Sequence, residues 1–79
     1  MSIVTAEQMA SHVAFCARLS PVQAKSAIEA IGSVILQQLA QGHAVAIEGF
    51  GLFEVATRED GSKGVKFRQA KKMREAING

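Results

Sequence analysis

An α+β fold is predicted for this chain, with two N-terminal helices, a short three-stranded antiparallel sheet and a C-terminal helix. Up to about residue 41, apolar residues recur every three to four positions, as on one side of a helix. From His43 the period changes to two, which is typical of strands. The length of 79 residues fits one domain, residues 1–79.

The first helix is expected over residues 5–18. Thr5 and Gln8 have the spacing of a capping box, in which each side chain bonds the other's backbone amide. Phe15 lies opposite the apolar stripe of this helix, so it is either an isolated exposed apolar residue or a contact for a protein partner. The predicted buried stripe consists of Met9, Ala10, Val13, Ala14 and Ala17.

The second helix is expected over residues 20–41. Ser20 is a favourable cap, Pro21 fits the first turn, and Gln23 completes a second capping box. Gly42 supplies a residue that can adopt the left-handed conformation after the helix. The apolar arc is wide enough to contact both the first helix and a second subunit; it consists of Ala24, Ala27, Ile28, Ile31, Val34, Ile35 and Leu39.

Three strands are expected, over residues 44–48, 52–57 and 65–68. Gly49 and Gly51 permit a tight reversal between the first two strands. A polar turn at residues 59–64 joins the second strand to the third. The last helix is expected over residues 69–77, with Met73, Ala76 and Ile77 on its buried side.

The composition indicates self-association. Apolar residues make up 48% of the chain, which is more than a domain of this size can hide in its own core. A dimer is therefore expected. No signal-type segment and no apolar run long enough to cross a membrane is found, and the single Cys16 is compatible with a reducing cytoplasm.

The charge is unevenly distributed along the chain. Residues 58–79 hold seven Lys or Arg against three Asp or Glu, a net charge of +4. The preceding residues hold two against four, a net charge of −2. The positive field therefore comes from the last quarter of the chain, which suits an anionic partner.

Catalytic and metal chemistry are not indicated. His12, Cys16 and His43 are too few and too far apart in sequence for a metal site. No nucleophile has a base and an orienting group at a suitable spacing, so the chain is not expected to be an enzyme. No cofactor and no small-molecule substrate are expected.

The segment Gly49-Phe50-Gly51-Leu52-Phe53-Glu54-Val55, together with the basic segment of residues 67–77, resembles the histone-like HU/integration host factor family of DNA-bending proteins. The resemblance covers nearly the whole chain except residues 56–64. It implies an intertwined dimer with Phe50 and Phe53 in the shared core. With the helical arc, the expected dimer core is Ile31, Val34, Ile35, Leu39, Phe50 and Phe53.

The family's long β-arm is expected to be truncated here. Only nine residues, 56–64, are available where family members carry a ribbon with a proline near its tip. The single proline of this chain is Pro21, so no proline wedge is available to unstack DNA bases. Gln69-Ala70 also replaces the family's Pro-Gly. The missing arm and its missing proline imply weakened bending.

The resemblance and the charge together predict sequence-tolerant binding of double-stranded DNA through backbone contacts, in the nucleoid. The partner chain is expected to be identical or a related chain. The alternative function is a dimeric protein-interaction module that has lost DNA binding. The expected DNA-binding residues form a basic cradle on the dimer: Arg58, Lys63, Lys66, Arg68, Lys71, Lys72 and Arg74.

Overall fold

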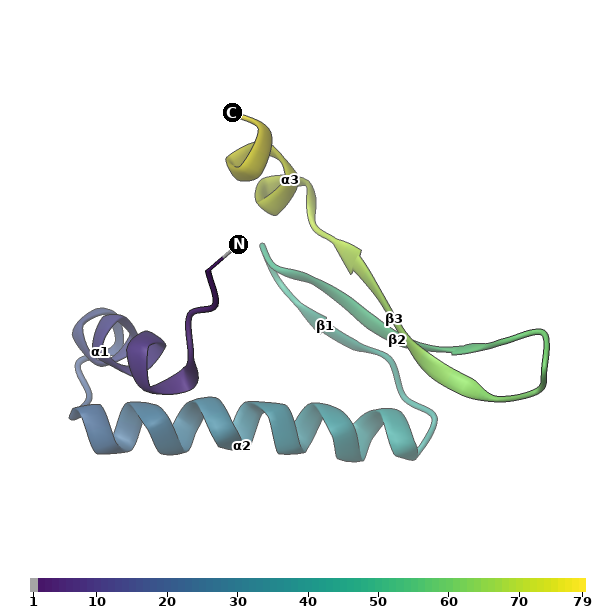
Figure 1. Cartoon of the computed structure of the whole chain (residues 1–79), viewed down its shortest axis with the longest axis horizontal. Coiled ribbons are helices and arrows are strands. Elements are labelled where there is room, and N and C mark those ends of the chain that lie inside the picture. Colours follow the sequence, from purple (N-terminus) through teal and green to yellow (C-terminus); the bar gives the residue numbers. More distant parts are fainter. Residues whose placement is uncertain (1) are drawn as a thin grey trace. The chain divides into compact units, whose positions relative to one another are not determined.

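The computed structural model describes residues 2–79 and shows the predicted order of three helices and three antiparallel strands (Figure 1). The fold class expected from the sequence is confirmed. The chain forms two compact units, Met1–Val34 and Ile35–Gly79. The elements are α1 (Ala6–Ala17), α2 (Pro21–Ala40), β1 (Val45–Ile47), β2 (Gly51–Thr57), β3 (Lys63–Gln69) and α3 (Lys71–Asn78).

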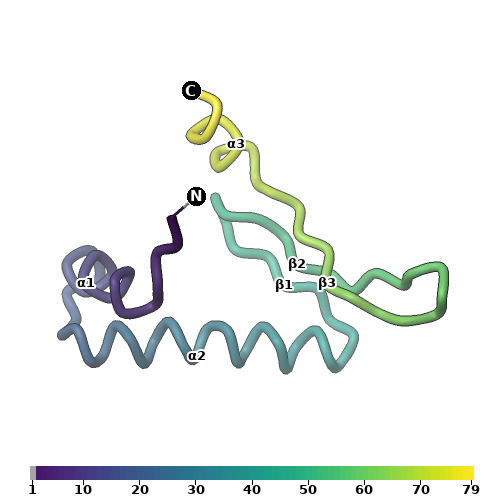
Figure 2. The backbone as a smooth tube through the Cα atoms, in the orientation of Figure 1, coloured from purple at the N-terminus to yellow at the C-terminus, as the bar shows by residue number. Residues whose placement is uncertain are grey.

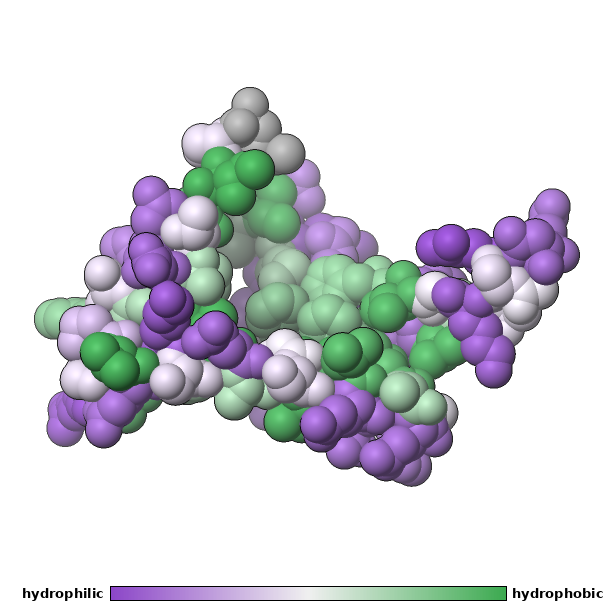
Figure 3. Space-filling model, turned by 60° about the horizontal axis from the view of Figure 1, so that its bottom comes forward, coloured by the Kyte–Doolittle hydropathy of each residue, from purple (hydrophilic) through white to green (hydrophobic). Residues whose placement is uncertain are grey.

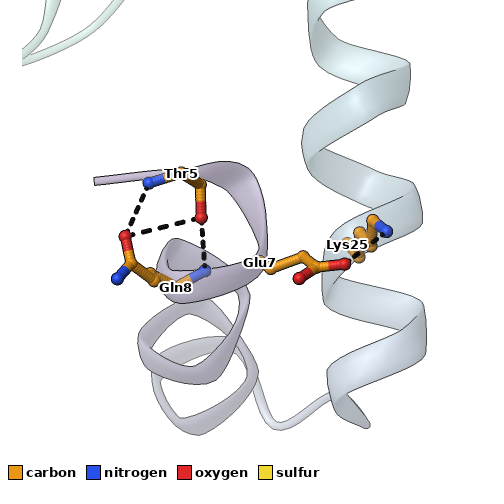
Figure 4. A network of polar contacts seen from close by, with 4 residues as sticks. All are labelled: Thr5, Glu7, Gln8 and Lys25. Atoms are coloured by element: carbon orange, nitrogen blue, oxygen red, sulfur yellow. Dashed lines mark hydrogen bonds and ion pairs between the residues drawn. The ribbon is translucent and has the colours of Figure 1, made fainter. Parts of the chain in front are cut away.

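Both N-terminal helices begin with the capping boxes that the sequence predicts. The Thr5 hydroxyl accepts a hydrogen bond from the Gln8 amide at 3.3 Å, and the Gln8 side chain accepts one from the Thr5 amide at 2.9 Å (Figure 4). Ser20 and Gln23 make the same pair of bonds, at 3.1 and 2.9 Å. Each box satisfies amides that would otherwise lack a partner at the start of the helix.

The core of the first unit is built from small side chains. Ala10 and Ala14 of α1 are buried together with Ala24 of α2, and Val13 and Ile28 pack against them. The buried stripe is therefore narrower than the sequence predicted, because Met9 and Ala17 are exposed. Alanines let two helices approach closely, which leaves a long side chain such as that of Met9 at the edge of the contact.

An ion pair joins the two helices of the first unit. The Lys25 ammonium lies 3.1 Å from the Glu7 carboxylate (Figure 4). The hydrogen bond and the charge of Glu7 raise the pKa of Lys25 above its ordinary value. Since both groups are exposed to water, the pair contributes little to stability.

The second unit begins with the last residues of α2, which ends as predicted with Gly42 in the left-handed region, at φ +88°. The His43 amide donates to the carbonyl of Gln38 at 2.9 Å, and the Gly42 amide donates to that of Leu39 at 3.0 Å. These bonds satisfy carbonyls at the end of the helix. The chain then turns into β1.

Gly49 and Gly51 have different roles at the first turn. Gly49 has φ +77°, and the Phe50 amide donates to the carbonyl of Ile47 at 3.0 Å, so Gly49 provides the reversal. Gly51 is already in β2. A Cβ atom at Gly51 would lie 2.5 Å from the Arg68 carbonyl oxygen and 2.6 Å from the Phe67 ring. Gly51 is therefore needed for close packing against β3, not for the turn.

The sheet has the order β1-β2-β3, and both pairings are antiparallel (Figure 2). β1 pairs only with the start of β2, as Val45 with Phe53 and Ile47 with Gly51. β2 and β3 pair along their whole length, from Gly51 with Gln69 to Thr57 with Lys63. The β2–β3 hairpin, here called the ribbon, therefore extends beyond β1.

The two faces of the ribbon differ in chemistry, because successive side chains of a strand point to opposite faces and paired residues share a face. Phe53 and Val55 share one face with Val65 and Phe67, which we call the apolar ribbon face. Leu52, Glu54 and Ala56 share the other with Gly64, Lys66 and Arg68, which we call the charged ribbon face.

The turn at the ribbon tip is shorter than the sequence predicted. It spans residues 58–62, so Lys63 and Gly64 belong to β3 and not to the turn. The Arg58 amide donates to the Ser62 carbonyl at 2.7 Å, and Gly61 adopts φ +87°. The Asp60 carboxylate accepts bonds from the Ser62 hydroxyl at 2.6 Å and from the Ser62 amide at 2.9 Å. These bonds close the turn early enough for Lys63 to pair with Thr57.

The last helix begins later than the sequence predicted. Gln69 belongs to β3, where it pairs with Gly51, and α3 starts at Lys71. Of the three residues expected on its buried side, Met73 is half-buried, whereas Ala76 and Ile77 are exposed. Within residues 2–79, no helix is both long and apolar enough to cross a membrane.

We predict that Gly51→Ala destabilises the fold by about 1–3 kcal/mol, because the new methyl group would collide with the backbone and an aromatic ring of β3. Gly64→Ala is the matched control. Its Cβ would approach only the long, unbranched Arg58 side chain, whose terminal nitrogen would lie 2.7 Å away. Chemical denaturation of both variants measures the difference. An equal loss of stability in the two variants would contradict the packing role of Gly51.

We predict that Ser62→Ala raises the pKa of Asp60. The Ser62 hydroxyl, and then the Ser62 amide, hold this pKa below its ordinary value. A lowered pKa in the folded state stabilises the turn above the pKa of the unfolded chain, and this contribution is lost as the pH falls through the folded value. An NMR titration of the Asp60 carboxyl carbon checks this. The same midpoint with and without the hydroxyl would show that it does not hold the carboxylate.

Candidate nucleic-acid interface

Three basic side chains lie along the charged ribbon face. Lys66 and Arg68 are alternate residues of β3, so their side chains emerge on the same face, about 7 Å apart along the strand. Both are exposed. The third is Arg58, from the turn.

Gly64 makes room for Arg58 on this face. A Cβ atom at Gly64 would lie 2.7 Å from a terminal guanidinium nitrogen of Arg58 and 3.1 Å from its Cζ. The guanidinium therefore occupies the position that a side chain at residue 64 would fill. Arg58, Lys66 and Arg68 thus follow one strand in a row, an arrangement that suits an extended anion such as a nucleic-acid backbone.

Glu54 lies within this row. It pairs directly with Lys66 across the ribbon, and its carboxylate Oε1 lies 2.8 Å from Arg68 Nε. A carboxylate this close makes a charge-assisted hydrogen bond. The sequence did not suggest this ion pair, because the two residues are far apart along the chain and meet only through the strand register.

Lys63 does not belong to this row. Its place in β3 puts it on the side of Val65 and Phe67, and it lines an apolar hollow of about 300 Å³ with Leu36, Leu39, Val55 and Val65. Because β3 already begins at Lys63, strand alternation places this side chain on the apolar ribbon face. The expected contact of Lys63 with DNA stays a prediction, made from outside this row.

The start of α3 carries a second group of cations. Lys71, Lys72 and Arg74 are exposed in its first turns, and the helix has no side-chain cap. The Ala70 amide donates to the Phe50 carbonyl at 2.9 Å, which fixes this start next to the β1–β2 turn. Arg68 lies on β3, outside this helix.

Two of these helix cations have close neighbours. The Lys71 ammonium lies 3.9 Å from the Glu75 carboxylate, one helical turn further on. The Lys72 side chain passes over the first turn of the sheet, with its Cδ 3.5 Å from the position of a Cβ at Gly49. Both remain exposed to solvent.

The residues expected in a dimer core are largely uncovered in the single chain. Ile31, Val34 and Phe50 are exposed, Ile35 and Phe53 are half-buried, and Leu39 is buried within its own chain. Figure 3 shows apolar residues gathered at the surface, whereas the tip of the ribbon is hydrophilic.

Phe67 completes an aromatic cluster that the sequence interpretation left incomplete. Its ring centroid lies 4.9 Å from that of Phe53 and 5.6 Å from that of Phe50. Phe50 and Phe67 are still 42% and 41% exposed, and Val65 is 60% exposed. The alternation Val65, Phe67 in β3 could have indicated these two residues as part of the same apolar surface.

Phe15 is 87% exposed on α1, as its position opposite the apolar stripe predicted. A role in partner contact stays a prediction. In the part of the chain that the structure describes, no three His, Cys, Asp or Glu side chains gather closely enough to hold a metal ion.

Comparison with known proteins identifies the family. Residues 4–62 match the family described as bacterial DNA-binding protein. The chain is similar to HU from Thermotoga maritima, with 30% sequence identity and a TM-score of 0.72, over 90% of this chain and 94% of that one. A point mutant of the same HU gives 31% identity and a TM-score of 0.75 over the same shares.

Anabaena HU, in a cocrystal structure with DNA, has the same fold. Its TM-score is 0.79 over 92% of this chain and 96% of that one, at 20% identity. No curated protein sequence matches the chain. Since the family match spans well over half of the residues and the fold agrees over 90% of the chain, the chain belongs to the HU/integration host factor family of bacterial DNA-binding proteins.

Proposed function

We propose that this chain binds double-stranded DNA without sequence preference, as a non-enzymatic architectural protein of the nucleoid. The observation that carries the proposal is the row of Arg58, Lys66 and Arg68 along the charged ribbon face. Lysine and arginine contacts to phosphates position a protein on DNA but do not read its sequence. The cocrystal of the Anabaena relative with DNA supports the choice of ligand.

The cations at the start of α3 are proposed to add further phosphate contacts. Lys71 and Lys72 stand where uncapped backbone amides and the helix dipole already favour an anion. The chain has no Tyr or Trp, and three of its four Phe form the aromatic cluster on the other side of the ribbon. Stacking on single-stranded bases is therefore not part of the proposal.

The binding unit is proposed to be a dimer. The exposed aromatic cluster, with Val55 and Val65, forms an apolar surface that a lone chain leaves in water. Burying apolar surface is worth about 25 cal/mol per Å², so a second chain covering this face would gain stability. Either an identical or a related chain could supply the complementary surface.

Bending is proposed to be weak. The turn at the ribbon tip consists of Arg58, Glu59, Asp60, Gly61 and Ser62, so it offers no apolar wedge to insert between base pairs. Its two acidic residues also repel phosphates. The ribbon can therefore lie along DNA but lacks the side chains that kink it.

We predict that the protein binds unrelated DNA duplexes with similar affinity at low salt, and that log K falls linearly with log salt concentration. Lys66→Gln should weaken binding to every duplex and reduce the salt slope by about 0.9 per lost contact. Lys25→Gln is the control, because Lys25 lies in the other unit and is paired with Glu7. Fluorescence anisotropy over a salt series measures both effects.

Affinity that does not respond to salt would contradict the proposal. So would a folded protein that fails to bind DNA at low salt. The latter result would favour the alternative function, a dimeric protein-interaction module.

A further inference from the structure

We propose that Glu54 lowers the DNA affinity of this protein, by neutralising part of the charged ribbon face. The inference rests on the proposed DNA binding and adds the residue that limits it. Among the strand residues on that face, all of which the structure describes, Glu54 is the only acidic one. It lies opposite Lys66 and bonds Arg68 Nε at 2.8 Å.

A purely structural role for this ion pair is weak. The side chains of Arg68 and Glu54 are 62% and 29% exposed, so water and salt screen their attraction. Ion pairs in such surroundings contribute little to folding. The carboxylate nevertheless competes with any phosphate that approaches Arg68, and it reduces the positive potential at Lys66.

Glu54 also has an effect that would favour DNA binding, because it holds the Arg68 guanidinium in a fixed orientation. Glu54 occupies only the Nε donor, so the terminal nitrogens of the guanidinium could still reach a phosphate from a fixed position. Contacts to the DNA backbone tolerate variable geometry, however, and a fixed orientation benefits Arg68 alone. The negative charge acts on Arg68 and on Lys66 together. The loss of charge therefore outweighs the gain in order.

Glu54→Gln separates the two effects, because glutamine keeps the shape and an oxygen acceptor for Arg68 but removes the charge. We expect Glu54→Gln to bind duplex DNA roughly two- to five-fold more tightly per chain at low salt. The salt slope should become steeper by up to about 0.9, so the gain should shrink as salt rises. Glu54→Ala should also bind more tightly than the unmodified protein.

Glu29→Gln is the matched control, because it removes the same charge from α2 in the other unit. The anisotropy measurement is made on the whole 79-residue chain, with the unfolding midpoint of each variant measured alongside. An equal gain in Glu29→Gln would overturn the inference, since net charge alone would then explain the effect. Unchanged affinity in Glu54→Gln with weaker binding in Glu54→Ala would also overturn it and assign Glu54 an orienting role.

The outcomes distinguish this inference from the proposed function. If the unmodified protein binds DNA and Glu54→Gln binds no better, only the role of Glu54 fails. If none of the folded variants binds at low salt, DNA binding fails, and the role of Glu54 fails with it. If Glu54→Gln and Glu54→Ala bind and the unmodified protein does not, the carboxylate is a strong internal inhibitor and the inference stands.

Discussion

The strict alternation of side chains along the β2–β3 ribbon is the constraint on which both proposed interfaces depend. Because the period of a strand is two, a register shift of one residue would exchange the two faces. The observed register requires glycine at residue 51, where the Arg68 carbonyl and the Phe67 ring occupy the space that a side chain would need. With this pairing fixed, phenylalanine and valine gather on one face, and Glu54, Lys66 and Arg68 lie on the other. Apart from Lys63, which lies on the apolar side, the strand cations and the apolar cluster therefore occupy different faces.

This separation suits the two proposed partners, DNA and a second chain, which differ in chemical character. An apolar surface gains stability only when water is excluded from it, whereas cations buried beside it would lose hydration without recovering it. Phosphate contacts on the opposite face can stay wet and exchangeable, which suits binding that does not read sequence. Gly64 also contributes to the charged ribbon face, because the absence of a side chain there lets Arg58 from the turn join the row of cations. Glu54 then sets how positive that row is.

Local signals in the sequence were sufficient for the element order and for the helix caps. Thr5 with Gln8, Ser20 with Gln23, and Gly42 each act through neighbours within a few residues, so their spacing alone predicts their bonds. Other features depend instead on where the Asp60–Ser62 turn closes and on which residues pair across the ribbon. These are the face of the ribbon on which Lys63 lies, the strand position of Arg68 and the place of the Arg58 guanidinium. The exposure of the Met9 side chain on α1 likewise depends on how closely the alanines allow the two helices to approach. Such features arise between segments, and periodicity within a segment does not determine them.

Covering the apolar ribbon face with a second chain is the central claim, and sedimentation velocity combined with thermal unfolding over a range of protein concentrations tests it most directly. The account predicts a dimer at micromolar concentration, with an unfolding midpoint that rises as the concentration increases, because association stabilises the folded chain. A folded monomer at every concentration, with a constant midpoint, would contradict it, since the exposed Phe50, Val65 and Phe67 would then need no partner.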